Sequence, residues 1–247
     1  MKICFILKSM IFLEQFRTQL GSNCPRLVRV YSKKKENLDF PIPRDLDELD
    51  EQLDIKGDDE ISLHHIIRRT NKPYNRRILE YDQKFSSNMH VPETISDSEI
   101  CAYQKLIKEA SAEELKNYDI ILCTCSTSAS NRLTHGVHIM QIIIDECAMC
   151  MEAESLIPLV NFQKAEKVVL IGAHKQLQPI IKNAEAKRLG LDVSLFERHA
   201  DNVHVMLDLQ YRMVGKHFIT FIIVALCSTK RTFVNFAKST LSFTDNS

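Results

Sequence analysis

The chain has 247 residues, of which 45% are hydrophobic, and this is enough for one large or two small domains with a packed core. Its 32 basic residues balance its 32 acidic residues, which excludes a global electrostatic attraction to nucleic acid and leaves only local contacts. Eight cysteines are too few for a disulfide scaffold in a chain of this length, and they suit a reducing compartment, cytoplasmic or nuclear.

The first part of the chain predicts one helix and one strand. Lys8 interrupts the apolar start and no small-residue cleavage site follows it, so a signal peptide is not expected. Residues 11–20 carry apolar side chains at near-helical spacing and predict a short helix that ends at Gly21. Residues 27–31 alternate as L-V-R-V-Y, the pattern of a half-exposed strand.

Charge is segregated in the stretch that follows. Nine of the sixteen residues from 45 to 60 are acidic, and residues 64–84 are rich in arginine and lysine. This pattern predicts that residues 45–95 form a charged insertion or mobile surface segment. We expect the basic side chains to form a solvated face, with an electrostatic contact to nucleic acid as the less favoured alternative.

Beyond residue 95 helical and strand patterns alternate. Ser96 and Glu99 suggest a capping box for a helix that ends near Lys116. The connections between the following strand candidates have about a dozen or more residues, the length of a parallel crossover. The pattern predicts a three-layer α/β fold. The strand candidates are residues 119–125, 140–145, 167–171 and, more weakly, 204–207.

Residues 218–227 are apolar except for Thr220. This stretch has about half of the ~20 residues that a membrane span needs. We therefore expect a buried strand or helix there and no contact with a membrane.

Three motifs follow one another within the alternating pattern. Residues 141–148 read Q-I-I-I-D-E-C-A, a Walker B box in which a buried strand delivers Asp145 and Glu146 to the end of a sheet where ligands bind. Residues 172–179 read G-A-H-K-Q-L-Q-P, and residues 210–213 read Q-Y-R-M. None of the six glycines belongs to a G-x-x-x-x-G-K-[ST] phosphate loop.

Together these motifs resemble motifs II, III and IV of superfamily 1 helicases in the group of the nonsense-mediated-decay helicase, with wording most similar to helicases with zinc fingers. The resemblance covers roughly residues 119–213 and reaches weakly back to 26–32. It implies a RecA-like parallel sheet of the P-loop NTPase type that is incomplete in this chain. Residues 1–44 would start motor domain 1, residues 96–213 would form its core, and residues 214–247 would be an atypical C-terminal tail.

The resemblance implies ATP and Mg²⁺ as cofactors. Asp145 would hold the magnesium ion through its water shell, and Glu146 would orient the attacking water. The family carries an aspartate where this chain has Ala173, and an alanine cannot accept a hydrogen bond from the water shell of the metal.

The same resemblance assigns the other catalytic and nucleotide-binding residues. Gln176 would sense the γ phosphate and couple hydrolysis to movement along the strand. Arg212 would be an arginine finger on the γ phosphate, positioned by Gln210 and Tyr211.

Residues 121–130, which read I-L-C-T-C-S-T-S-A-S, resemble the motif Ib region. Thr124, Ser126, Thr127 and Ser128 would donate hydrogen bonds to the backbone of single-stranded RNA or DNA, contacts that position a strand without reading its sequence. An ordinary loop rich in serine and threonine is the equally open alternative.

Two cysteine pairs, C-x-C at residues 123–125 and C-x-x-C at 147–150, would suffice for a zinc ion. The first pair lies in a predicted buried strand, where alternation would put both sulfurs on one face. We therefore favour buried thiols over a zinc site.

Two functions follow from the motifs. The family implies a fragment of an ATP-dependent helicase, whereas the chain alone favours a non-hydrolysing pseudo-helicase fragment that binds nucleic acid or protein. Without a phosphate-loop strand beside it, the strand at residues 167–171 is expected to keep an unpaired apolar edge that promotes aggregation.

Overall fold

The computed structural model describes residues 2–6, 24–43, 60–88, 95–173, 178–199, 205–207 and 221–227, the last two ranges as backbone only. The helix predicted at residues 11–20 lies outside these ranges. Contacts divide the chain into two compact units. The first unit comprises Met1–Cys24, Cys123–Ser130 and His138–Ser247, and the second comprises Pro25–Leu122 and Asn131–Val137.

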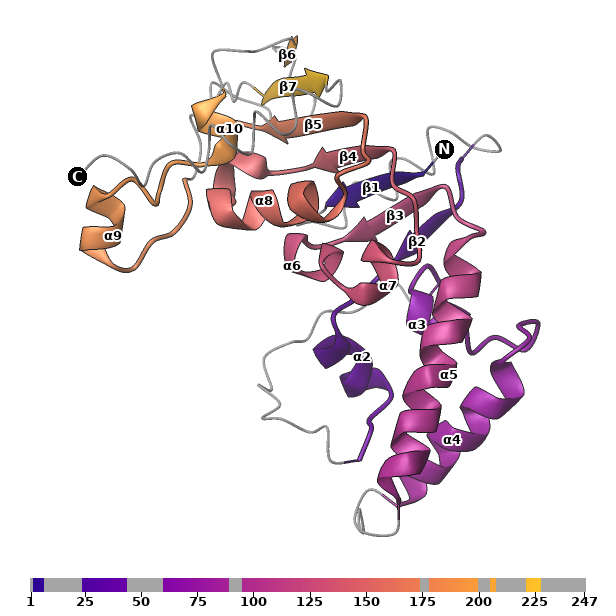
Figure 1. The fold of residues 1–247 in the computed structure, drawn as a ribbon. Helices are drawn as coiled ribbons and strands as arrows, with labels where there is room; N and C mark the ends of the chain where they lie inside the picture. Colours follow the sequence, from indigo (N-terminus) through magenta and orange to yellow (C-terminus); the bar gives the residue numbers. More distant parts are fainter. Residues whose placement is uncertain are drawn as a thin grey trace, which may run out of the picture. The chain divides into compact units, whose positions relative to one another are not determined.

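The first unit is built on a sheet with the strand order β1-β4-β5-β7-β6 (Figure 1). Strands β1, β4 and β5 are parallel, as the α/β prediction requires, whereas β7 is antiparallel to both β5 and β6. The strands are β1 (Ile3–Ile6), β4 (Gln141–Ile144), β5 (Lys167–Gly172), β6 (Val205–Leu207) and β7 (Phe221–Cys227).

Short helices accompany this sheet, and α8 packs against both β4 and α6. Phe196 of α10 is fully buried, and α10 contacts both β5 and η3. The helices of the unit are α6 (Cys125–Ser128), the 3₁₀ turn η3 (Cys147–Met149), α8 (Glu152–Asn161), α9 (Ala184–Arg188) and α10 (Leu195–Arg198).

The second unit combines two parallel strands with helices. β2 (Leu27–Arg29) pairs with β3 (Ile120–Cys123), in register from Leu27↔Ile120 to Arg29↔Leu122. The helices are α2 (Lys33–Asp39), α3 (Leu63–Ile66), α4 (Asn75–Ser87), α5 (Asp97–Leu115) and α7 (Asn131–Thr134). Helices α4 and α5 lie side by side (Figure 1).

The predicted capping box at the start of α5 is confirmed. The Ser96 hydroxyl accepts a hydrogen bond from the Glu99 N–H at 3.4 Å, and the Glu99 carboxylate accepts one from the Ser96 N–H at 3.1 Å. These bonds give side-chain partners to the Ser96 and Glu99 N–H groups at the start of α5, where the backbone donors of a helix lack i−4 carbonyl partners.

The stretch expected to be a charged insertion or mobile segment contains packed helices between residues 60 and 88. Ile78 is completely buried and Phe85 is 1% exposed. Arg68 Nε lies 2.7 Å from Asp82 Oδ2, and the Tyr103 hydroxyl donates to Asp82 Oδ1 at 2.6 Å. Within the described part of this stretch, Arg68 and Asp82 therefore pair inside the unit, whereas Arg76 remains exposed.

The prediction of an unpaired edge at residues 167–171 is wrong. Strand β5 pairs with β4 along one edge and with β7 along the other, from Lys167↔Cys227 to Gly172↔Ile222. Within the predicted apolar element at residues 218–227, the described residues Phe221–Cys227 form a strand. Its sheet partner was not predicted, because alternation and hydrophobicity do not encode the identity of a distant neighbour.

Strand β1 was not predicted, because four residues in an apolar start give little periodic signal. In the described parts of the chain, no helix has the length and apolar character that a membrane crossing requires.

We predict that Val224→Pro disrupts β7 and leaves the β5 edge open, since proline removes a ladder donor in a strand that has neighbours on both sides. The variant should form aggregates in size-exclusion chromatography with light scattering. Thr229→Pro, which lies beyond the strand, is the control and should behave as the wild type. A monodisperse Val224→Pro chain with an unchanged thermal melt would contradict the protective role of β7.

Candidate functional site

Strand β4 carries two adjacent carboxylates to the carboxyl end of the parallel strands. Ile142 and Ile144 have no exposure, so their burial holds the strand in the sheet. The Asp145 N–H extends the ladder by donating to the Ile6 carbonyl of β1 at 3.0 Å. The chain then leaves the sheet at Glu146, which precedes η3. Asp145 and Glu146 are both half-buried at this edge.

Glu146 adopts a left-handed backbone conformation, with φ 52° and ψ 34°. Among the described residues it is the only non-glycine with a positive φ. This conformation costs ~1–2 kcal/mol for a residue with a Cβ. Strain of this kind persists where the surrounding structure imposes it, and it gathers at functional sites. Cys147 and Ala148, which follow Glu146 in the turn, are buried, and their burial holds the turn in place.

The two carboxylates create a local excess of negative charge. Burial raises the pKa of Asp145, and the neighbouring Glu146 carboxylate raises it further, while a hydrogen bond from the Glu146 N–H acts in the opposite direction. Within the described residues, no lysine, arginine or histidine forms an ion pair with Asp145 or Glu146. Carboxylate oxygens without a cationic partner fit Mg²⁺, which prefers oxygen ligands.

The end of β5 packs directly against this turn. A Cβ on Gly172 would lie 3.0 Å from the Ala148 nitrogen and 3.1 Å from its Cβ, so glycine permits the close approach of strand and turn. Ala173, at the position of the family aspartate, is 3% exposed. This position therefore offers a buried methyl group and no acceptor.

The hydroxyl residues after β3 divide into two kinds. Thr124 caps α6, because its Oγ1 accepts from the Thr127 N–H at 3.2 Å and lies 2.9 Å from Thr127 Oγ1. Ser128 is completely buried and donates to the Cys125 carbonyl at 2.5 Å. Ser126 and Thr124 are exposed. Ser128 is therefore not available to a phosphate in this arrangement, whereas Thr124 and Ser126 are accessible.

The cysteines depart from the predicted strand pattern. Strand β3 ends at Cys123, and Cys125 begins α6, so the two sulfurs do not follow strand alternation. A hydrogen bond with Cys150, together with burial, raises the pKa of Cys125. This favours the thiol, whereas zinc binds the thiolate. The Cys4 and Cys123 sulfurs lie 3.6 Å apart.

The remaining predicted site residues lie outside the described residues. These are Gln176, Gln210, Tyr211 and Arg212. Two features of the site were not predicted from the sequence. These are the hydrogen bond from the Asp145 N–H to the Ile6 carbonyl and the left-handed conformation of Glu146. A third feature, the close approach at Gly172, did have a local signal, since a glycine at the end of an apolar strand indicates a tight contact.

Comparison with known proteins identifies similar chains. The AAA domain family matches residues 11–184, a range that ends before the Q-Y-R-M motif. The human 3'-5' exoribonuclease HELZ2 is 43% identical over 192 residues, which are 75% of this chain and 6% of that protein.

More distant relatives cover a similar region. The ATP-dependent helicase NAM7 of Saccharomyces cerevisiae is 32% identical over 155 residues, 62% of this chain and 15% of that protein. The regulator of nonsense transcripts 1 homolog of Arabidopsis thaliana is 28% identical over 207 residues, 83% of this chain and 15% of that protein. The chain thus spans a small part of the length of each relative.

We predict that Glu146→Gly makes the chain more stable than Glu146→Ala by ~1 kcal/mol, because glycine adopts the left-handed conformation without a Cβ penalty. Urea unfolding of the two variants measures this difference. The same pair at Glu109, exposed within α5, is the control and should show the opposite order, since glycine weakens a helix interior by ~1 kcal/mol. An alanine variant at position 146 that equals or exceeds the glycine variant in stability would rule out strain at this turn.

Proposed function

Because this chain belongs to the AAA domain family, we propose that it carries the magnesium-holding and water-orienting carboxylates of an ATP-dependent helicase motor. The similarity to NAM7 and to a regulator of nonsense transcripts supports a superfamily 1 helicase of the nonsense-transcript-regulator group. The narrower prediction of a helicase with zinc fingers is part of this proposal and rests on the amino-acid sequences of the motifs.

The observation that carries the proposal is the pair of half-buried carboxylates at the end of β4, without a cationic partner among the described residues. When bound, Mg²⁺ would neutralise charge on the nucleotide phosphates. Asp145 would hold that ion through water molecules. Glu146 would accept a hydrogen bond from the attacking water and so orient it. Gln176 and Arg212 would contribute the γ-phosphate contacts that the resemblance implies.

The chain alone lacks several parts of such a motor. Its sequence contains no G-x-x-x-x-G-K-[ST] loop, and Ala173 provides no acceptor beside the metal. In the motors that it resembles, the strand leading into the phosphate loop lies beside the strand of motif III. Here β7 pairs with that edge of β5 and runs antiparallel to it. These observations favour the non-hydrolysing alternative for the chain on its own, acting as a nucleic-acid or protein binding module.

We include single-stranded RNA or DNA as the polymer partner of the motor. Thr124 and Ser126 are exposed residues, and their hydroxyls would contact the nucleic-acid backbone, which positions a strand without reading its sequence. HELZ2 is named an exoribonuclease and another relative is named for nonsense transcripts, and these names support RNA as the first substrate to test.

The metal role of Asp145 is testable with Mn²⁺ as a paramagnetic substitute for Mg²⁺. We predict that Asp145→Asn weakens Mn²⁺ binding by ~10-fold, because it removes the charge that holds the hydrated ion. The electron paramagnetic resonance signal of free Mn²⁺ measures the binding. Glu152→Gln is the matched control, since Glu152 pairs with Arg198 at 2.8 Å and belongs to α8. Equal binding by the wild type and Asp145→Asn would remove the basis of the proposed function.

We also predict that the 247-residue chain releases phosphate from ATP no faster than its Glu146→Gln variant, with or without single-stranded RNA. The reason is the missing phosphate loop, whose lysine reaches the β and γ phosphates in P-loop enzymes. A phosphate-release assay of both proteins makes this comparison. RNA-stimulated turnover that Glu146→Gln abolishes and Glu152→Gln retains would show that the chain is active by itself.

A further inference from the structure

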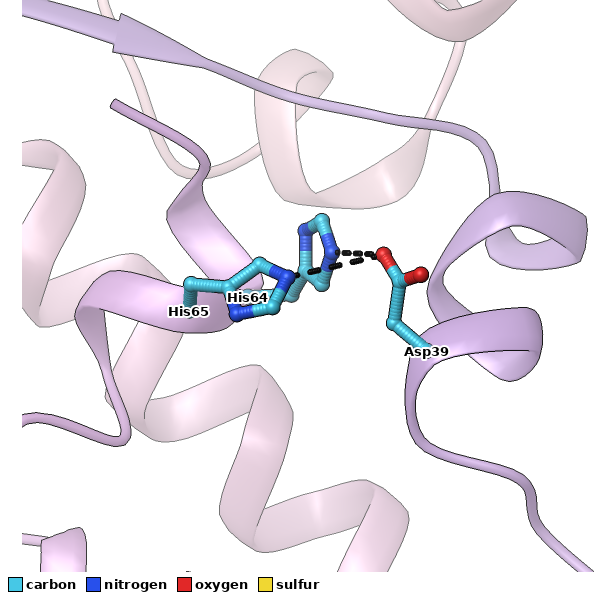
Figure 2. A group of neighbouring side chains, drawn as sticks. All are labelled: Asp39, His64 and His65. Atoms are coloured by element: carbon cyan, nitrogen blue, oxygen red, sulfur yellow. Dashed lines mark hydrogen bonds and ion pairs between the residues drawn. The ribbon is translucent and has the colours of Figure 1, made fainter. Parts of the chain in front are cut away.

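Three side chains with metal-binding atoms converge in the second unit (Figure 2). Asp39 ends α2, whereas His64 and His65 belong to the short helix α3. Asp39 Oδ2 lies 2.8 Å from His64 Nε2 and 3.5 Å from His65 Nε2. One ligand atom from each residue lies within 4.8 Å of the other two. The arrangement joins residues that are 25 positions apart in the sequence.

We propose that Asp39, His64 and His65 bind a divalent transition-metal ion, with zinc as the best match. Two imidazole nitrogens and one carboxylate oxygen form a donor set that zinc takes, with a fourth position left for water. Zinc bonds of ~2.0–2.1 Å in a tetrahedron place ligand atoms about 3.3 Å apart. The separations of 2.8 and 3.5 Å from Asp39 Oδ2 bracket that value, so small side-chain movements suffice.

The cluster is largely sheltered from solvent. The His64 side chain is 2% exposed, and those of Asp39 and His65 are 23% and 26% exposed. Burial lowers the pKa of His64 to about 4, although the hydrogen bond with Asp39 opposes this shift.

Two cationic side chains near the cluster, Lys35 and Arg68, each pair with a carboxylate. Lys35 Nζ lies 3.0 Å from Asp39 Oδ1, the carboxylate oxygen that does not face the histidines. This contact fixes the carboxylate while Oδ2 remains directed at His64. Arg68, whose charge lowers the pKa of His64, pairs with Asp82 at 2.7 Å.

Aromatic rings surround the histidines and limit their movement. The Phe40 ring lies 5.1 Å from the His65 ring, and the Tyr31 ring lies 5.6 Å from the His64 ring. The two imidazoles themselves are 4.5 Å apart. A simple Asp–His hydrogen bond would not require a second imidazole directed at the same carboxylate oxygen. We infer that the metal fastens the end of α2 to α3 and stabilises the folded second unit.

The test uses the full, reduced chain with zinc chloride as the probe. One zinc ion per chain should bind and raise the melting temperature. Asp39→Asn and His65→Gln should each weaken binding by ~10-fold or more, by analogy with losses of metal-site residues. His135→Gln, an exposed histidine of the same unit, is the matched control and should bind as the wild type does.

Cobalt(II) separates this cluster from the cysteines of the chain. A site of nitrogen and oxygen ligands should give visible d–d bands without the strong near-ultraviolet absorption of a cobalt–thiolate bond. Far-ultraviolet circular dichroism without metal checks that each variant folds. Asp39→Asn, which keeps the side-chain volume, carries the test if His65→Gln does not fold. No zinc-dependent change in the wild type, cobalt–thiolate absorption alone, or binding that survives Asp39→Asn would overturn the proposal.

Discussion

Strand β4 is held between β1 and β5 by parallel ladders and by Ile142 and Ile144, which have no exposure to solvent. Burying two such side chains contributes ~1.5–3 kcal/mol each. This exceeds the ~1–2 kcal/mol that the left-handed conformation of Glu146 costs. Packing of the sheet can therefore keep two adjacent carboxylates at its edge, where burial and mutual repulsion raise the pKa of Asp145. The chemistry proposed for this edge depends on that balance.

Some opposite charges of the second unit pair with each other in sheltered positions. Arg132 lies 2.8 Å from Glu36, and burial raises the pKa of Glu36 more strongly than Arg132 lowers it. Arg68 is similarly paired and only 8% exposed. Of the basic residues that suggested a solvated face, Arg76 does remain 90% exposed, next to Glu80. The basic residues between positions 64 and 84 therefore do not all lie on one surface that could bind nucleic acid.

Strand β7 makes part of the C-terminal stretch a member of the sheet. An antiparallel neighbour satisfies the backbone donors and acceptors along the second edge of β5 without a crossover helix. This arrangement continues the sheet of the first unit beyond β5, in the strand order β1-β4-β5-β7-β6. It also places a strand without a phosphate loop beside the strand that ends at Gly172.

Elements with local signals could be predicted from the amino-acid sequence alone. The isoleucine run and its two carboxylates identified β4 and its end, and Ser96 with Glu99 identified the start of α5. Three features could not be predicted in this way: the pairing of β7 with β5, the left-handed conformation of Glu146, and the meeting of Asp39 with two histidines. Periodicity and capping depend on residues within a few positions, whereas strand partners and convergent side chains depend on contacts between distant segments.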